Sequence, residues 1–101
     1  MNVATDLRFV KSIEDKSIED LVMDKLEKLS KKFDWIVSAD VYLKDEKDSK
    51  QRGKICEIRL SVPGPRIFAS SDEESFEESV AETIRDLMVQ LVKRKDKLKR
   101  H

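Results

Sequence analysis

The last nine residues of the chain, 93–101, carry the side chains best suited to bind a polyanion. Six of them are basic: Lys93, Arg94, Lys95, Lys97, Lys99 and Arg100. The whole chain has 21 basic and 21 acidic residues and a formal net charge of zero, so this run is a local excess. Such a localised positive field favours nucleic acid as a partner. The alternative is that these cations only offset the negative end of a helix dipole.

A second set of cations is expected on an earlier helix. At 100° per residue, Lys25, Lys28 and Lys32 fall in one line beside the apolar stripe of that helix. On the final helix, Lys93, Lys97 and Arg100 point away from the core, with Arg94 on the flank. If the helices are neighbours, these groups form one basic surface suited to phosphate contacts. Alternatively, Lys25 and Lys28 pair with acids such as Asp24 and Glu27 on their own helix.

Catalytic chemistry has few candidates. The one histidine, His101, is the terminal residue, and Cys56 falls on the inward face of its strand with Ile58 and Leu60, as a buried thiol would. The chain has two glycines, too few for a glycine-rich phosphate loop, and no Cys/His cluster with metal-ligand spacing. The acids of 72–78 suit a helix N-terminus better than a metal site. We therefore expect no enzyme, no cofactor, no metal and no small-molecule substrate.

Length and composition predict a single domain spanning residues 1–101. Charge is segregated, because residues 72–82 hold six acids and no Lys or Arg, whereas 93–100 are mostly basic. The N-terminus lacks the features of a signal peptide, and no apolar run is long enough to span a membrane. A single cysteine fits a reducing compartment. These features predict a cytoplasmic protein that has no membrane partner.

Alternating apolar residues predict the strands. Val37, Ala39, Val41 and Leu43 form one buried face, and Cys56, Ile58, Leu60 and Val62 form another. The polar segment 45–52 is expected to be a solvated hairpin loop between them. A tight turn at Pro63-Gly64-Pro65 leads into a short strand, 66–70. An N-terminal strand is expected through Leu7 and Phe9.

Two amphipathic helices complete the set. Residues 15–33 carry apolar side chains at three- and four-residue steps. Ser71-Asp72-Glu73-Glu74 predicts a capping box that starts the second helix. Its stripe contains Phe76, Val80, Ile84, Leu87, Leu91 and Leu98. The order β-α-β-β-β-α predicts an α+β two-layer sandwich, a four-stranded sheet with a parallel crossover and both helices packed on one face.

Three segments resemble the bacterial ribosome hibernation-promoting factors, a family that includes the ribosome-associated translation inhibitor and was formerly called the sigma-54 modulation proteins. The segments are Lys25 to Asp34, Ser38 to Lys44 and Lys93 to Arg100. The likeness covers essentially the whole chain and includes the β-α-β-β-β-α layout. It implies a protein that occupies the messenger and transfer RNA channel of the small ribosomal subunit, near the decoding centre. There it would inhibit translation by steric occlusion during stress.

The resemblance also implies binding residues. Matching positions that would contact 16S rRNA are Lys25, Lys28, Lys32, Lys93, Arg94, Lys95, Lys97, Lys99 and Arg100. Where members of the family often carry basic residues, this chain has Glu19, Asp86 and Val89, and Arg85 would replace part of that charge. Because the chain ends at His101, it resembles the short type without a dimerisation domain. Pairing of ribosomes would then need a separate dimerising factor.

Two other functions remain open from the sequence. The first is a generic module that binds double-stranded RNA, which would bind free duplexes as well as ribosomes. The second is a protein-interaction module that uses the acidic start of the second helix and the loop 45–52. The first function predicts an affinity for RNA that depends on salt, whereas the second predicts little such affinity.

Overall fold

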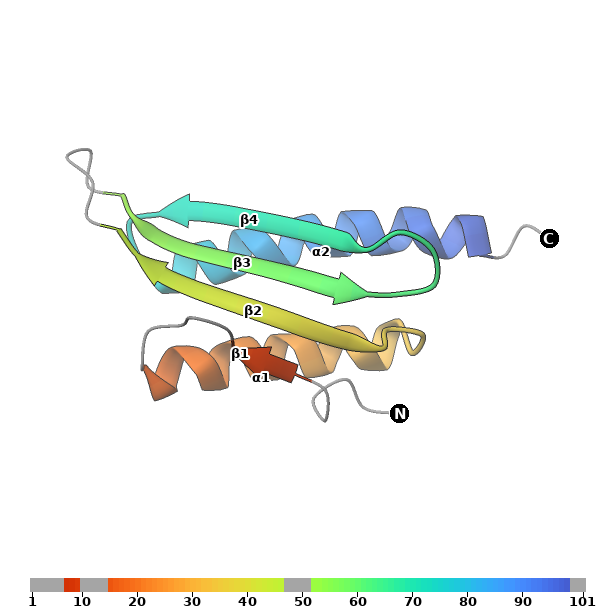
Figure 1. Cartoon of the computed structure of the whole chain (residues 1–101), viewed down its shortest axis with the longest axis horizontal. Helices are drawn as coiled ribbons and strands as arrows, with labels where there is room; N and C mark the ends of the chain where they lie inside the picture. Colours follow the sequence, from red (N-terminus) through yellow and green to blue (C-terminus); the bar gives the residue numbers. More distant parts are fainter. Residues whose placement is uncertain (1–6, 10–14, 47–51, 99–101) are drawn as a thin grey trace.

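The structure is a computed structural model that describes residues 7–9, 15–46 and 52–98. Its elements follow the predicted order: β1 (Leu7–Phe9), α1 (Lys16–Lys32), β2 (Ser38–Asp45), β3 (Lys54–Ser61), β4 (Ile67–Glu73) and α2 (Phe76–Leu98). The four strands form one sheet in the order β1-β2-β3-β4. β1 pairs with β2 in parallel, and the other two pairings are antiparallel. The predicted fold class and the parallel crossover are therefore confirmed (Figure 1).

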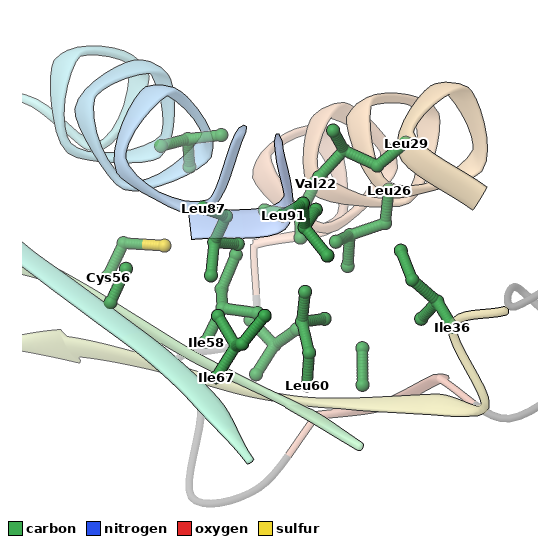
Figure 2. Packing of buried hydrophobic residues seen from close by; sticks show 14 of the residues in the cluster. Val22, Leu26, Leu29, Ile36, Cys56, Ile58, Leu60, Ile67, Leu87 and Leu91 are labelled. Atoms are coloured by element: carbon green, nitrogen blue, oxygen red, sulfur yellow. The ribbon is translucent and has the colours of Figure 1, made fainter. Parts of the chain in front are cut away.

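The register of the sheet places its apolar residues on one face. Val41 lies opposite Ile58, and Leu60 lies between Ala39 and Ile67, and all five side chains are buried. Figure 2 shows how the two helices contribute to the same core: Val22, Leu26 and Leu29 come from α1, and Leu87 and Leu91 come from α2. Burial of this apolar surface is the main stabilising term of such a two-layer domain.

Helix α1 has the predicted bounds because both of its ends are capped. The carboxylate of Asp15 accepts hydrogen bonds from the backbone N–H groups of Ser17 and Ile18. The Ser17 hydroxyl, which donates to the same carboxylate, is the largest cause that holds the pKa of Asp15 below its usual value, followed by the Ile18 N–H. At the other end, the backbone N–H of Phe33 bonds to the carbonyl of Leu29.

The predicted start of α2 is wrong. Strand β4 continues to Glu73, beyond the predicted end at residue 70, so Ser71 lies within a strand and caps no helix. The cap is Ser75, whose side-chain oxygen accepts from the backbone N–H of Glu78 at 3.2 Å. Both serines are followed three residues later by Glu, so the sequence offered two capping boxes. Pairing of Ser71 with Cys56 on β3 selects the second one.

The apolar face of β2 also differs at its start. Val37 is 50% exposed, whereas its neighbour Ile36 is buried in the core. Strand β2 begins only at Ser38, and the N–H of Val37 bonds to the carbonyl of Ser61. The strict alternation that predicted a buried Val37 therefore applies to Ala39, Val41 and Leu43 alone.

The stripe of α2 includes two polar residues that its apolar spacing did not reveal. Ser79 and Thr83 are fully buried, and their hydroxyls donate to the backbone carbonyls of Lys54 and Cys56 on β3. Ile84 and Leu98, which were expected to be buried, are only half-buried. Hydroxyls that bond to strand carbonyls satisfy their own polarity, which allows them to occupy core positions.

Candidate nucleic-acid interface

Charge changes sign along each helix. The first half of α1, Lys16–Asp24, has three acids and one lysine, whereas the second half, Lys25–Lys32, has four lysines and one Glu. Helix α2 repeats the pattern: Phe76–Asp86 has four acids and one Arg, and Leu87–Leu98 has four cations and one Asp. Acids near the N-terminus and cations near the C-terminus also suit the helix dipole.

The fold gathers the positive charges of both helices at one end of the molecule. Both helices run in the same direction, so their C-terminal halves lie at the same end of the domain, beside the β3–β4 turn (Figure 1). We call this the basic end: Lys28, Lys31 and Lys32 of α1, and Lys93, Arg94, Lys95 and Lys97 of α2. The longest dimension of the molecule is 49 Å. The acidic helix starts lie toward the other end, so a neutral chain presents a separate positive surface.

The α1 cations differ in how freely they can bind. Lys25 is half-buried, and Lys32 is exposed, with its Nζ 5.8 Å from the centre of the Phe33 ring. Lys28 forms an ion pair with Asp24, Nζ to Oδ2 3.4 Å, one helical turn away. The alternative interpretation of this lysine as a partner of a helix acid therefore holds for the free protein. Exposed pairs of this kind are weak, so a phosphate could displace the carboxylate.

The α2 cations divide into exposed and anchored groups. Lys93 and Lys97, one helical turn apart, are exposed, as expected, and Lys95 is half-buried. The Nη1 of Arg94 donates to two backbone carbonyls of the β3–β4 turn, at 2.8 Å to Pro63 and 2.7 Å to Pro65. Arg94 therefore ties the end of α2 to this turn, a structural role that the sequence did not reveal.

Three of the proposed contacts surround one concave feature of the basic end. A hollow of about 160 Å³ between α2 and β4 is lined by Ile67, Gln90, Lys93, Arg94 and Lys97. The amide nitrogen of Gln90 donates to the carbonyl of Phe68 on β4 at 2.8 Å and to Asp86 at 3.1 Å. The amide group of Gln90 is thus held in one orientation at the rim of the hollow.

The sequence did not single out Gln90 or Ile67 as part of a site. A signal was present, because Gln90, Lys93 and Lys97 recur at steps of three and four residues and so share one helix flank. The contribution of Ile67 depends on the approach of β4 to α2, which no local pattern in the sequence encodes.

The remaining candidate residues lie outside the basic end or outside the described residues. Arg85 pairs with Glu82, in the acidic half of α2. Lys99 and Arg100 lie outside the described residues. Of the three positions where basic residues were missing, Glu19 is half-buried, Val89 is exposed, and Asp86 bonds to Gln90.

The face of the sheet opposite the helices is a separate polar surface. Tyr42 is half-buried there and Phe68 is 45% exposed, and both face away from the helices. Arg59 lies opposite Phe68 in the register, whereas Arg8 is paired with Asp40, Nε to Oδ1 3.1 Å. Because Arg8 pairs with Asp40 and Lys44 pairs with Glu57, this face has a weaker positive field to offer a polyanion than the basic end.

Other kinds of site have little support in the part of the chain that the structure describes. No group of three or more His, Cys, Asp or Glu side chains is placed to hold a metal ion within residues 7–9, 15–46 and 52–98. No helix in the same ranges is long and apolar enough to cross a membrane. Cys56 is fully buried, and its burial raises the pKa of the thiol to about 11, against a smaller opposing effect of the hydrogen bond with Thr83. A thiol with this pKa is a poor nucleophile at neutral pH.

Comparison with known sequences identifies the family to which the chain belongs. Residues 12–99 match the family described as sigma 54 modulation protein / S30EA ribosomal protein. A curated relative from Klebsiella oxytoca, named ribosome hibernation promoting factor, is 35% identical over 85 residues, which is 84% of this chain and 85% of the relative.

Two solved structures share the fold. A ribosomal subunit interface protein from Coxiella burnetii matches with a TM-score of 0.73 at 20% identity, over 90% of this chain and 96% of the other. The N-terminal domain of Thermus thermophilus Protein Y matches with a TM-score of 0.65, also at 20% identity and over the same shares of the two chains.

Proposed function

The chain belongs to the family of sigma 54 modulation protein / S30EA ribosomal proteins, and we propose that it is a ribosome hibernation factor. It binds the small ribosomal subunit in the channel for messenger and transfer RNA, near the decoding centre, and its main partner there is 16S rRNA. The observation that carries this proposal is the gathering of the cationic halves of both helices at one end of a neutral domain.

The proposed mechanism is occupation of space. The domain measures 49 × 25 × 18 Å, and a rigid two-layer body of this kind would exclude other ligands from the channel it fills. Lys31, Lys32, Lys93 and Lys97 are exposed at the basic end and would contact phosphates there. Phosphate contacts fix position and carry little sequence information, so shape and charge would supply the specificity. The acidic end would face away from the RNA.

The experiment is sedimentation of the purified protein with 30S subunits and 70S ribosomes at low and high monovalent salt. We expect co-sedimentation at low salt, weaker association at high salt, and release when messenger and transfer RNA are added together. Replacement of two cations, Lys93→Glu with Lys97→Glu, should abolish association. A matched control, Lys16→Glu with Arg52→Glu, changes the net charge equally at two exposed positions outside the basic end and should retain it.

The outcomes separate this function from the two others that the sequence left open. Equal affinity for free RNA duplexes and for ribosomes would contradict the proposal and favour a generic module for double-stranded RNA. No co-sedimentation even at low salt would also contradict it and favour a protein-interaction module. Co-sedimentation that messenger and transfer RNA fail to reverse would contradict occupation of their channel.

A further inference from the structure

We propose that the hollow between α2 and β4 is a subsite for one ribose-phosphate unit of an RNA strand. This inference rests on the proposed function and deepens it, because it assigns a defined ligand group to one place on the basic end. The hollow has about 160 Å³ and is lined by Ile67 of β4 and by Gln90, Lys93, Arg94 and Lys97 of α2.

Arg94 is the preorganised phosphate ligand of this subsite. Its Nη1 is committed to the carbonyls of Pro63 and Pro65, which fixes the plane of the guanidinium. A guanidinium has five N–H donors, so Nε and Nη2 retain three of them. Among the described residues, none accepts from that edge. An Nε–Nη2 edge matches two phosphate oxygens, and a side chain that is already anchored loses little further freedom on binding.

Lys93 and Lys97 supply the rest of the positive field. They lie one helical turn apart on the flank of α2 that lines the hollow, and both are exposed. Within the described part of the chain, neither forms an ion pair with an acid. The nearby acid Asp86 accepts from Gln90 and keeps its negative charge, but the three cations that line the hollow outnumber it. The hollow therefore has a net excess of cations around one anion-sized space.

Gln90 gives the subsite its preference for ribose. Its amide nitrogen must face Phe68 O and Asp86 Oδ1, because both of these are acceptors, and this leaves the Oε1 of Gln90 as an acceptor. No described residue donates to Oε1. A phosphodiester has no proton to offer it at neutral pH, but the 2′-hydroxyl of the adjoining ribose does. The 2′-hydroxyl is the group by which a protein distinguishes RNA from DNA.

The apolar side of the hollow is consistent with this ligand. Ile67 is 2% exposed and belongs to the core, so the side of the hollow nearest β4 is rigid and offers no competing hydrogen bond. Because so little of Ile67 is accessible, a sugar ring would pack its carbon atoms against the aliphatic stems of Lys93 and Lys97, which also line the hollow. The anchored turn, the fixed amide and the buried isoleucine together define the position of one nucleotide unit.

The test uses the free protein, residues 1–101, and the ribodinucleoside monophosphate ApA, which has one phosphodiester and one 2′-hydroxyl next to it. Titration is followed by NMR at the Arg94 Nε–Hε and Gln90 side-chain amide signals. We expect both sets to shift, and we expect the deoxy analogue to bind about three- to tenfold more weakly, because it lacks one hydrogen bond. Dimethyl phosphate, a phosphodiester without a ribose, should shift Arg94 and leave Gln90 unchanged. Equal affinity for the ribo and deoxy forms, or unshifted Arg94 signals, would overturn the subsite.

Variants sharpen the result. Lys93→Gln with Lys97→Gln should weaken binding of ApA about tenfold or more, whereas Lys16→Gln with Arg52→Gln, outside the hollow, should leave it unchanged. Arg94→Lys keeps the charge and should still weaken binding, because a lysine cannot hold both the turn and two phosphate oxygens. Equal weakening by the two double variants would overturn the subsite.

Failure of the subsite can be told apart from failure of the proposed function. If the protein co-sediments with 30S subunits but ApA leaves Arg94 unshifted, the subsite is overturned and the proposed function stands. If ApA binds as expected but ribosomes do not co-sediment, the subsite is supported and the proposed function is overturned.

Discussion

Lys93 and Arg94 are adjacent cations, yet the fold gives them different roles. Lys93 is exposed, and its charge is available to a ligand. The Nη1 of Arg94 is bound to two carbonyls of the β3–β4 turn, so part of its hydrogen-bonding capacity holds the protein together. The difference follows from direction: side chains one residue apart on a helix point about 100° from each other, and only one of these two meets the turn.

Burial also sets the chemistry of Cys56 and predicts a pH dependence of stability. The pKa of its thiol is raised from 9.0 to about 11 in the folded protein. The unfolded chain therefore loses this proton first, and stability falls as pH rises from 9 through 11, by about 2 kcal/mol at pH 11. Below pH 9 this contribution is fully present. Urea unfolding of the wild type and of Cys56→Ala across pH 8–11 would measure it.

The Cys56→Ala variant is the control for every other group that titrates in this range. Its stability should fall less steeply with pH than that of the wild type. Parallel pH profiles for the two proteins would show that the thiol makes no such contribution.

At the level of elements, a helix can be capped only by a residue whose backbone is not already paired in a strand. Ser71 and Ser75 have equivalent capping-box spacing, but the backbone of residue 71 pairs with β3, and only residue 75 is free to cap α2. Asp15, the first residue of the predicted helical range 15–33, caps α1 and belongs to no strand. A local motif is thus reliable where tertiary pairing does not claim the same residues.

The capping assignment predicts unequal effects of two similar substitutions. Ser75→Ala should lower the free energy of unfolding by about 1 kcal/mol, because it removes the acceptor for the Glu78 N–H. Ser71→Ala should change stability by less than about 0.5 kcal/mol, since no cap is lost. Chemical denaturation of both variants gives the comparison. A larger loss for Ser71→Ala would contradict the assignment.

The β3–β4 turn makes a second prediction at this scale. Gly64 has φ +87°, in the left-handed region, and a Cβ there would lie 3.2 Å from the Nη1 of Arg94. Gly64→Ala should therefore lower the free energy of unfolding by about 1–2 kcal/mol. It should also shift the Arg94 Nε–Hε signal, because the two groups compete for space. Unchanged stability together with an unmoved Arg94 signal would contradict this close approach.

At the level of the whole molecule, a neutral net charge conceals a strong separation of charge. Each helix is acidic first and basic last, and the parallel arrangement of the two helices adds these patterns together. Antiparallel helices with the same sequences would have cancelled them. Steering of a polyanion depends on this arrangement in space and not on the net charge of the chain.

This separation predicts how ribosome binding responds to salt. If about five phosphates are neutralised, the logarithm of affinity should fall with the logarithm of salt concentration with a slope of roughly −4. Lys93→Gln with Lys97→Gln should reduce the steepness by about 2, because two contacts are lost. Glu77→Gln with Glu78→Gln, at the acidic end, should leave the slope unchanged. Equal changes in slope for the two pairs would contradict a localised interface.

The sequence by itself determined the element order, the amphipathic faces and the candidate cations, because periodicity and charge are properties of neighbouring residues. Only the tertiary structure decided that Ser75 caps α2, that Ile36 replaces Val37 in the core, and that Arg94 holds a turn 29–31 residues away. The tertiary structure also added Ile67 and Gln90 to the candidate site, because it brings β4 next to α2. These outcomes depend on which distant segments compete for the same backbone groups and the same space, and local patterns do not encode that competition.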